Sequence, residues 1–314
     1  MNFCEASQFL KQHDDYLILT HKNPDGDAVG SAAALCLMLR ALGKTAYVYH
    51  NPGFTARFSQ FLDGLTTEDT HGTVISVDLA DASLVPQNAK DLAQKAVFAV
   101  DHHETHRAYA KNLLLDGKAA ACGELVLKLS DELSVSLTRE IARALYLAIV
   151  TDTGSFCYSN TTAETHLAVA RLLPLFDDAH EINHTFCVEK SRARATLEAR
   201  LLTNANFYFD GKCVALTVTR ALMAELGLCE DDLDNLASVA RAIQGVSLAL
   251  VLRELENGDT KASLRSNPDV DASAICRVFH GGGHRCAAGC TLPLSCKDSE
   301  MQILETITEF GVFQ

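Results

Sequence analysis

Histidine and aspartate residues gather in four short segments in the first half of the chain. In chain order they are His21, Asp25, Asp27, Asp78, Asp101, His102, His103 and Asp152. Carboxylate and imidazole groups without cysteine suit Mn²⁺, Fe²⁺, Co²⁺ or Mg²⁺ better than structural zinc. Six such ligands that share one carboxylate would hold two ions about 3.5–4 Å apart, which is the spacing of two-metal sites for phosphoryl transfer.

Each segment also has a simpler interpretation by itself. Asp25 or Asp27 could cap the helix that follows, because Asp is a preferred N-cap. Asp78 could merely end a strand, and the two adjacent histidines could be exposed loop residues. Asp152 ends a helical run, where a negative charge is unfavourable against the helix dipole and needs another reason. The metal-site hypothesis therefore depends on whether the segments converge in space.

The elements around these segments predict that convergence. Short apolar β-type runs at 16–20, 46–49, 74–77 and 97–100 alternate with helical runs at 27–42, 120–133 and 139–150. This alternation favours an α/β fold with a mostly parallel sheet and helices on both faces. The carboxyl ends of parallel strands meet at one edge, where ligands bind. Three of the four segments follow predicted strands directly.

The pattern changes in the second half of the chain. Residues 162–203 read as helical, and β-type runs follow at 205–209, 213–219, 247–254 and 261–266. We therefore expect a catalytic domain over 1–160, a helical connector over 161–200 and a smaller α+β domain over 201–314.

Composition sets outer limits on function. A length of 314 residues suggests two domains, and 27 Lys and Arg against 40 Asp and Glu give a net charge of −13. This acid excess argues against wrapping long nucleic acid. No apolar run reaches the roughly 18 residues of a membrane span, and no secretory signal is evident. Eleven scattered cysteines are interpreted as reduced thiols, so a cytoplasmic protein is expected.

The motifs resemble those of a known family. HKNPDGDAVGS, VDLAD, VDHHETH and TDTGSF resemble, in order, the four motifs of the DHH phosphoesterases. The segment from His280 to Gly289 is similar to the glycine-rich motif of the associated DHHA1 domain, and Ser263-Leu264-Arg265-Ser266 precedes it as is typical. The chain is similar to the small nanoRNase/pAp-phosphatase type, which implies an active site in the cleft between a DHH and a DHHA1 domain.

The resemblance implies a ligand set for two metal ions. One ion would be held by His21, Asp25 and Asp78, and the other by Asp27, Asp78, His102 and Asp152. Asp78 would bridge them. Mn²⁺ is the ion expected first, with Mg²⁺ and Co²⁺ as alternatives.

Catalytic roles are implied for two neighbouring residues. His103 would contact the phosphate or act as a general acid, and Asp101 would orient His102. Asp81 stays open between a structural and a supporting role. His106 has no matching partner in the motifs and is expected to be a surface or structural residue.

The glycine-rich segment is expected to bind the far end of the substrate. The residues assigned to this role are Arg265, Ser266, Gly281, Gly282, Gly283 and His284. Backbone N–H groups could approach a phosphate closely there, and a helix following the segment would add its N-terminal field. The alternatives are a flexible turn, or a zinc site formed by the histidines and cysteines of 280–290. His280 stands where the family usually has a fourth glycine.

The expected activity is metal-dependent hydrolysis of very short oligoribonucleotides, including pGpG and pApA, to nucleoside 5′-monophosphates. Removal of the 3′-phosphate of pAp is a further activity of the family. The alternatives are a cyclic-dinucleotide phosphodiesterase, a pyro- or polyphosphatase, and a non-catalytic nucleotide-binding regulator. Short RNA or mononucleotide phosphates are the expected partners, without long nucleic acid or membrane, and the resemblance suggests a homodimer.

Overall fold

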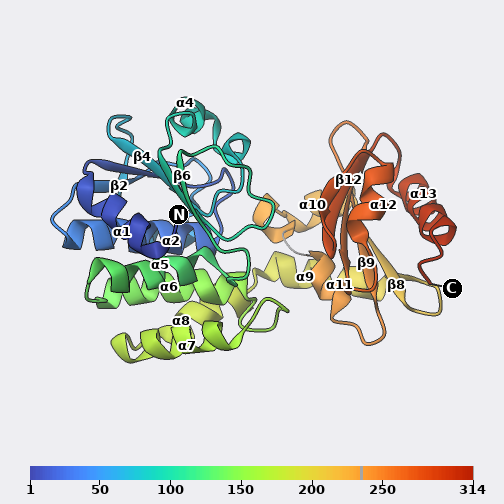
Figure 1. Cartoon of the computed structure of the whole chain (residues 1–314). Coiled ribbons are helices and arrows are strands. Elements are labelled where there is room, and N and C mark those ends of the chain that lie inside the picture. Colours follow the sequence, from blue (N-terminus) through green and yellow to red (C-terminus); the bar gives the residue numbers. More distant parts are fainter. Residues whose placement is uncertain (234–235, 314) are drawn as a thin grey trace. The chain divides into compact units, whose positions relative to one another are not determined.

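The computed structural model describes residues 1–233 and 236–313 and divides into two compact units, Met1–Glu189 and Lys190–Gln314 (Figure 1). The boundary falls inside 161–200, which was expected to be a separate helical connector. Most of that stretch packs on the first unit, because Val169, Leu172 and Ile182 belong to its core. Residues 189–191 are not helical, so the connection is a short extended segment.

The first unit is built on a six-stranded sheet in the order β3-β2-β1-β4-β5-β6, and all five pairs are parallel. Its strands are β1 (Tyr16–Leu19), β2 (Ala46–Tyr49), β3 (Thr66–Thr67), β4 (Thr73–Val77), β5 (Phe98–Asp101) and β6 (Asn112–Leu115). Its helices are α1 (Phe3–Gln12), α2 (Gly26–Ala41), α3 (Ser59–Leu62), α4 (Lys90–Ala93), α5 (Cys122–Leu133), α6 (Arg139–Asp152), α7 (Ala163–Leu172) and α8 (Ala179–Asn183). The predicted parallel sheet is confirmed, although β3 and β6 were not predicted.

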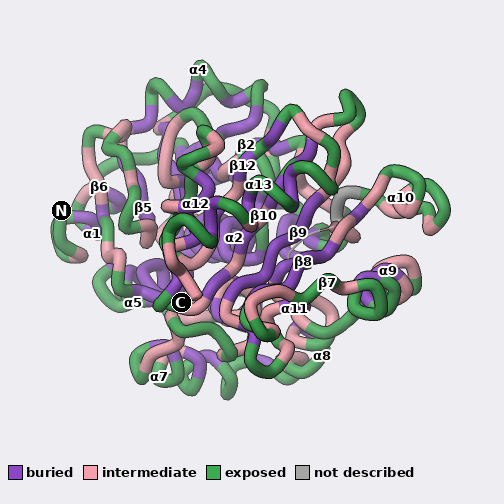
Figure 2. Tube along the Cα trace, turned by 90° about the vertical axis from the view of Figure 1, so that its right-hand side faces the viewer, coloured by how far each residue is buried: buried purple, intermediate pink, exposed green. Residues whose placement is uncertain are grey.

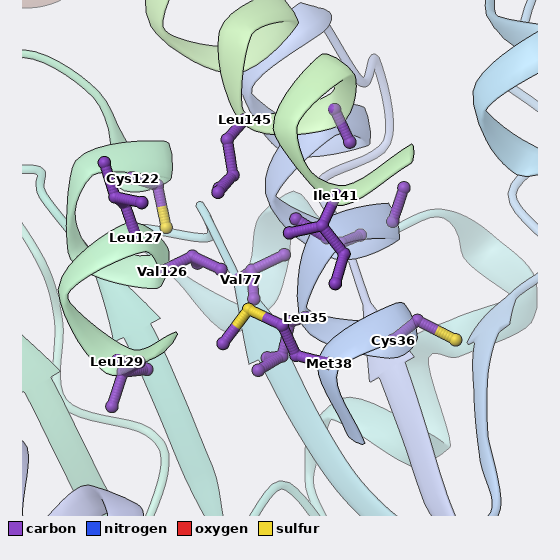
Figure 3. Packing of buried hydrophobic residues seen from close by; sticks show 14 of the residues in the cluster. Leu35, Cys36, Met38, Val77, Cys122, Val126, Leu127, Leu129, Ile141 and Leu145 are labelled. Atoms are coloured by element: carbon purple, nitrogen blue, oxygen red, sulfur yellow. The ribbon is translucent and has the colours of Figure 1, made fainter. Parts of the chain in front are cut away.

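Alternation along β1 sends side chains to two cores. Ile18 packs with α1, α2, α5 and α6 on one face, whereas Leu17 and Leu19 pack with α4 on the other. In Figure 3, Leu35 of α2 lies beside Val77 of β4 in the larger core. Helices therefore cover both faces, and only the strand ends are left to carry polar chemistry.

Small residues let α2, α5 and α6 approach closely. A Cβ atom on Gly30 would lie 2.3 Å from the carbonyl oxygen of Ala144, and one on Gly123 would lie 2.6 Å from the Cβ of Ala148. This packing sets the relative position of the N-terminal ends of α2 and α5 and the C-terminal end of α6, which carry part of the candidate site.

The second unit contains a mixed six-stranded sheet in the order β11-β12-β10-β9-β8-β7. Its strands are β7 (Asn206–Tyr208), β8 (Cys213–Val218), β9 (Leu248–Glu254), β10 (Thr260–Ser266), β11 (Gly282–His284) and β12 (Ala287–Leu292). Its helices are α9 (Arg192–Thr203), α10 (Arg220–Leu226), α11 (Leu236–Arg241), α12 (Ala272–Val278) and α13 (Cys296–Glu309). Figure 2 shows β8 and β9 as largely buried tube, which agrees with cores on both faces of this sheet.

Short helical turns complete the described chain, namely the 3₁₀ turns at Ala56–Phe58, Ala82–Leu84, Gln87–Ala89, Leu173–Leu175 and Glu230–Leu233 and the π-helical turn at His184–Val188. Within the described residues, no helix combines the length and apolar character needed to cross a bilayer.

Candidate metal centre

The strand ends place the motif residues at one edge of the first sheet. His21 follows β1, Asp78 follows β4, and His102 follows β5. The chain leaves β1 towards β2 on one side and later continues from β4 to β5 on the other. The strand order therefore reverses between β1 and β4, which is where open parallel sheets bind ligands. His21 and Asp78 lie on either side of that point.

Asp78 occupies the centre of the cluster. Its Oδ2 lies 3.5 Å from Nε2 of His21, and its Oδ1 lies 3.5 Å from Nε2 of His102. The residue is only 3% exposed, and its Oδ1 atom has no hydrogen-bond partner. Its φ of 50° lies in the left-handed region, which is uncommon for a residue other than glycine.

His102 is oriented for ligation through Nε2. Its Nδ1 lies 3.1 Å from the carbonyl oxygen of Ala119 and donates a hydrogen bond to it, so Nε2 is the nitrogen that can ligate a metal once it is deprotonated. Nε2 also lies 3.6 Å from Oδ2 of Asp27 and 3.6 Å from Oδ2 of Asp152.

The Asp27 carboxylate is held by the start of α5, 95 residues further along the chain. Oδ2 accepts a hydrogen bond from the amide of Cys122 at 2.6 Å, and Oδ1 accepts from the amide of Gly123 at 3.0 Å. The Ser31 hydroxyl donates to Oδ1 at 2.9 Å. Asp27 is therefore not the cap of its own helix. Ser31 was missed by sequence reasoning, although it lies one helical turn after Asp27.

Asp25 does cap α2, and it also belongs to the cluster. Its Oδ1 accepts from the amides of Asp27 and Ala28 and lies 3.8 Å from Nε2 of His21. Asp152 is the last residue of α6. Asn160 fixes this end, because its amide donates to the carbonyl oxygens of Ala120 and Asp152. Sequence reasoning also missed Asn160.

These side chains form three overlapping donor groups. Within each group, the ligand atoms lie within 4.8 Å of one another. The groups are His21, Asp25 and Asp78; Asp27, His102 and Asp152; and Asp78, His102 and His103. They bring together all six residues expected as metal ligands. In the described ranges 1–233 and 236–313, these are the only groups of this kind.

The electrostatics of the cluster fit bound cations. Burial, together with the charge of Asp78, raises the pKa of Asp27, and burial is the main cause that raises the pKa of Asp152 to about 7. Burial opposes a charge on the two histidines, but the surrounding carboxylates raise the pKa of His21 to about 10 and that of His102 to about 11. Carboxylates crowded in this way repel one another, and divalent cations relieve that repulsion. An oxygen and nitrogen donor set without sulfur suits hard or intermediate divalent metals.

Asp101 does not have the expected contact with the His102 ring. From His102, Asp101 accepts only the backbone N–H, at 2.8 Å. The same Oδ1 atom lies 2.8 Å from Nδ1 of His103. Its Oδ2 lies 2.5 Å from Nδ1 of His106. Asp101 therefore orients His103 rather than the His102 ring. His106, expected to be a surface or structural residue, is a buried neighbour of this group.

Asp81 lies outside the donor groups. Its carboxylate accepts from the amide of Ser83 at 2.8 Å and pairs with Arg107 at 3.2 Å. These contacts give it a structural role at the loop after β4.

In the second unit, the glycine-rich segment forms a hairpin instead of a loop followed by a helix. Gly282–His284 is β11, which pairs with β12, and α12 precedes it. The expected field of a following helix N-terminus is therefore wrong. The zinc alternative gains no support, since none of the three donor groups includes a residue of 280–290.

The register places Arg265 and His284 on the same face of this sheet. Both are directly opposite Ala287, one from each side. Between them, Ala287 contributes only a methyl group. Ser266 is the next residue of β10 and must point to the opposite face. It is buried, and its hydroxyl donates to the carbonyl oxygen of Val270 at 2.7 Å, so its expected contact with substrate is not supported.

The three glycines differ in their surroundings. Gly281 donates its N–H to the carbonyl oxygen of Cys276, and a Cβ there would lie 2.3 Å from the carbonyl oxygen of Gly289. Gly283 is equally confined, by Ala287. A Cβ on Gly282 would meet nothing within 4 Å. Only Gly282 therefore has open space that a ligand could fill.

Comparison with known proteins agrees with this architecture. Residues 15–149 match the N-terminal domain of the DHH family, and residues 210–311 match the DHHA1 domain. The chain is 33% identical over 297 residues to the bifunctional oligoribonuclease and PAP phosphatase NrnA of Thermus thermophilus, which covers 93% of this chain and 89% of that protein. The protein of the same name from Bacillus subtilis is 23% identical, over 92% of both chains.

Solved structures share the fold. An exopolyphosphatase-related protein from Bacteroides fragilis matches with a TM-score of 0.85 at 22% identity, over 98% of this chain and 96% of that one. Exonuclease RecJ bound to manganese matches with a TM-score of 0.53 at 14% identity, over 99% and 94%. From the family matches, the extended identity to the Thermus protein and the shared fold, the chain belongs to the DHH family of phosphoester hydrolases, with a DHHA1 domain after its DHH domain.

Proposed function

We propose that this chain hydrolyses very short oligoribonucleotides, including linear dinucleotides such as pGpG and pApA, to nucleoside 5′-monophosphates. We include removal of the 3′-phosphate of pAp in the proposal. The observation that carries it is the set of donor groups sharing Asp78 and His102 at the strand ends. The names of the curated relatives, oligoribonuclease and PAP phosphatase, support this choice of substrate class.

The proposed metal ligands follow the donor groups. His21, Asp25 and Asp78 would hold one divalent ion, and Asp27, Asp78, His102 and Asp152 a second, with Mn²⁺ expected first and Mg²⁺ or Co²⁺ as alternatives. Bound there, such ions neutralise charge on a phosphoryl group and lower the pKa of water. Within the chain, α5 fixes Asp27 and the Ala119 carbonyl fixes His102, so these two ligands need little reorganisation.

His103 is the proposed catalytic residue that contacts the phosphate. Its side chain is one-third exposed, and Asp101 holds the ring through Nδ1. In the second domain, Arg265 and His284 would bind the far phosphate of the substrate, and Gly282 would let its backbone approach. An anchor of two side chains suits a short substrate with a terminal phosphate.

The deciding experiment is a product time course with purified protein and Mn²⁺. Labelled pGpG, a pentaribonucleotide, a 24-mer, pAp, cyclic di-AMP and polyphosphate are compared, with Asp78→Ala as the control. We expect fast conversion of the two shortest RNAs and a nearly intact 24-mer. Dominant turnover of cyclic di-AMP or polyphosphate would replace the proposed substrate class, and metal-independent turnover would overturn the site.

A cytoplasmic location and a homodimer remain part of the proposal. Fractionation of cells tests the first, and sedimentation of the purified protein tests the second. A sedimenting monomer at micromolar concentration would contradict the dimer.

A further inference from the structure

His106 is a buried histidine outside the proposed metal ligands and makes one close polar contact. Its side chain is 1% exposed, and its Nδ1 lies 2.5 Å from Oδ2 of Asp101. The other oxygen of Asp101 lies 2.8 Å from Nδ1 of His103. Both oxygens of one fully buried carboxylate are therefore occupied by imidazole rings, one on each side.

We propose that His106 is a positioning residue that acts through Asp101 to hold the His103 ring with Nε2, and not Nδ1, turned towards the substrate phosphate. This inference rests on the proposed function, because it assumes that His103 contacts the phosphate.

The tautomer of His106 follows from its surroundings. Its Nε2 atom is buried and has no hydrogen-bond partner. A proton on Nε2 would leave a buried donor unsatisfied and would set the Nδ1 lone pair against the carboxylate. A proton on Nδ1 instead makes a hydrogen bond to Asp101. His106 therefore donates to Oδ2 and fixes the plane of the carboxylate.

The fixed carboxylate then decides which nitrogen His103 presents. Oδ1 accepts from the backbone N–H of His102 at 2.8 Å and faces Nδ1 of His103. An ionised carboxylate can only accept, so Nδ1 of His103 must carry its proton towards Asp101. Nε2 is the nitrogen that is left for the substrate.

His106 is itself held from the sheet. Its ring stacks on Tyr109, with centroids 5.4 Å apart and planes 29° apart. The Tyr109 hydroxyl donates to the carbonyl oxygen of Leu79 at 3.0 Å and is 2.7 Å from the hydroxyl of Ser76 in β4. A continuous set of contacts therefore runs from β4 through His106 and Asp101 to His103.

Two substitutions separate the hydrogen bond from packing. His106→Phe keeps a ring without a donor, whereas His106→Asn places an amide N–H near the position of Nδ1. With pApA and Mn²⁺, we expect His106→Phe to lower kcat about 10- to 100-fold, as loss of an outer hydrogen bond does in metal sites, with KM and Mn²⁺ affinity unchanged. His106→Asn should recover most of the kcat. Thermal unfolding shows whether each variant is folded.

The second readout does not depend on activity. In Mg²⁺-loaded protein with ¹⁵N-labelled histidine, the His103 resonances are assigned by their loss in His103→Gln. We expect Nδ1 of His103 to carry a proton in wild type and in His106→Asn, and to carry it only in part of the molecules in His106→Phe. An Nδ1 without a proton in wild type would overturn the inference, as would unchanged kcat in a folded His106→Phe variant. A wild type without phosphoester turnover would overturn the proposed function, while the tautomer would still decide the role of His106.

Discussion

Asp78 is the residue on which the candidate metal centre depends most. It belongs to two of the three donor groups, it is buried, and it adopts a left-handed backbone conformation at the end of β4. Its unsatisfied Oδ1 atom costs stability unless something binds there. The arrangement therefore favours ligation over folding stability, as is expected of a functional site.

Asp78→Asn should greatly lower metal-dependent activity without unfolding the chain. Asn tolerates the left-handed conformation, and the change removes one charge from a crowded cluster. Loss of a metal ligand should cost several kcal/mol in the transition state, which is about a thousandfold in kcat. Steady-state kinetics and Mn²⁺ titration measure the effect. The matched control is Asp81→Asn, which should keep full activity, and equal losses in both variants would contradict the assignment.

The histidine pKa values predict that metal binding releases protons. His21 and His102, with pKa values raised to about 10 and about 11, are protonated at pH 7 in the metal-free protein. A histidine must lose its proton to ligate a metal, so binding should release protons from these residues. Because protons are released, affinity for Mn²⁺ should increase as the pH rises from 6 to 8. Calorimetry in buffers of different ionisation enthalpy counts the protons, and a count of zero would contradict the ligand roles.

His280 adopts a backbone conformation that is strained for a residue other than glycine. Its φ is 57°, at the point where the chain leaves α12, and the family motif usually has glycine there. His280→Gly should raise the free energy of unfolding by about 1 kcal/mol, because the left-handed conformation is strained for other residues. The reverse change, Gly227→Ala at φ 62° with open space around the Cβ, should lower it by a similar amount. Urea unfolding measures both, and a destabilised His280→Gly variant would show that the side chain makes a stabilising contact.

At the scale of elements, the sequence predicted what strong local patterns encode. β1, β2, β4 and β5 are short apolar runs, and each was expected within one residue of its observed bounds. β3 has only two residues, and β6 is only partly buried, so neither has a clear pattern. Of the proposed ligand residues, His21, Asp78 and His102 could be expected because they follow strands, where side chains serve chemistry more than packing, whereas Asp27 lies in α2 and Asp152 ends α6.

The positioning contacts could not be predicted in the same way. Ser31 and Asn160 act on atoms whose places depend on how α2, α5 and α6 pack. The hairpin of β11 and β12 escaped prediction because Gly281 and Gly283 serve close backbone approach and leave no alternation of side chains. The alternating faces of β10 also show why Arg265 and Ser266 could not share one role.

The hairpin predicts a contrast between two neighbouring glycines. Gly282→Ala adds a methyl group in open space, so stability should not change, whereas Gly281→Ala forces a Cβ against the Gly289 carbonyl and should destabilise the second domain. If the hairpin binds substrate through its backbone, Gly282→Ala should raise KM for pApA with little change in kcat. Kinetics and urea unfolding separate the two effects. An unchanged KM in Gly282→Ala would remove this segment from the substrate site.

At the scale of the whole molecule, charge is distributed unevenly between the domains. Met1–Glu189 contains 14 basic and 24 acidic residues, so most of the acid excess lies in the domain with the candidate metal centre. Bound divalent cations reverse the sign locally, whereas the rest of that domain stays repulsive to a phosphate backbone. Attraction for the substrate must therefore be local.

A weak dependence on salt follows from that local attraction. Proteins that bind nucleic acid along its backbone displace many counterions and lose affinity steeply as salt increases, with a slope that tracks the number of phosphates contacted. Contact with one or two phosphates should give kcat/KM for pApA a logarithmic slope of magnitude below about 2 between 50 and 200 mM KCl. Initial rates at fixed Mn²⁺ measure it, with the 24-mer as the comparison. A slope several times steeper, or a 24-mer favoured at low salt, would show that an extended surface binds RNA, and the substrate class would then have to include long chains.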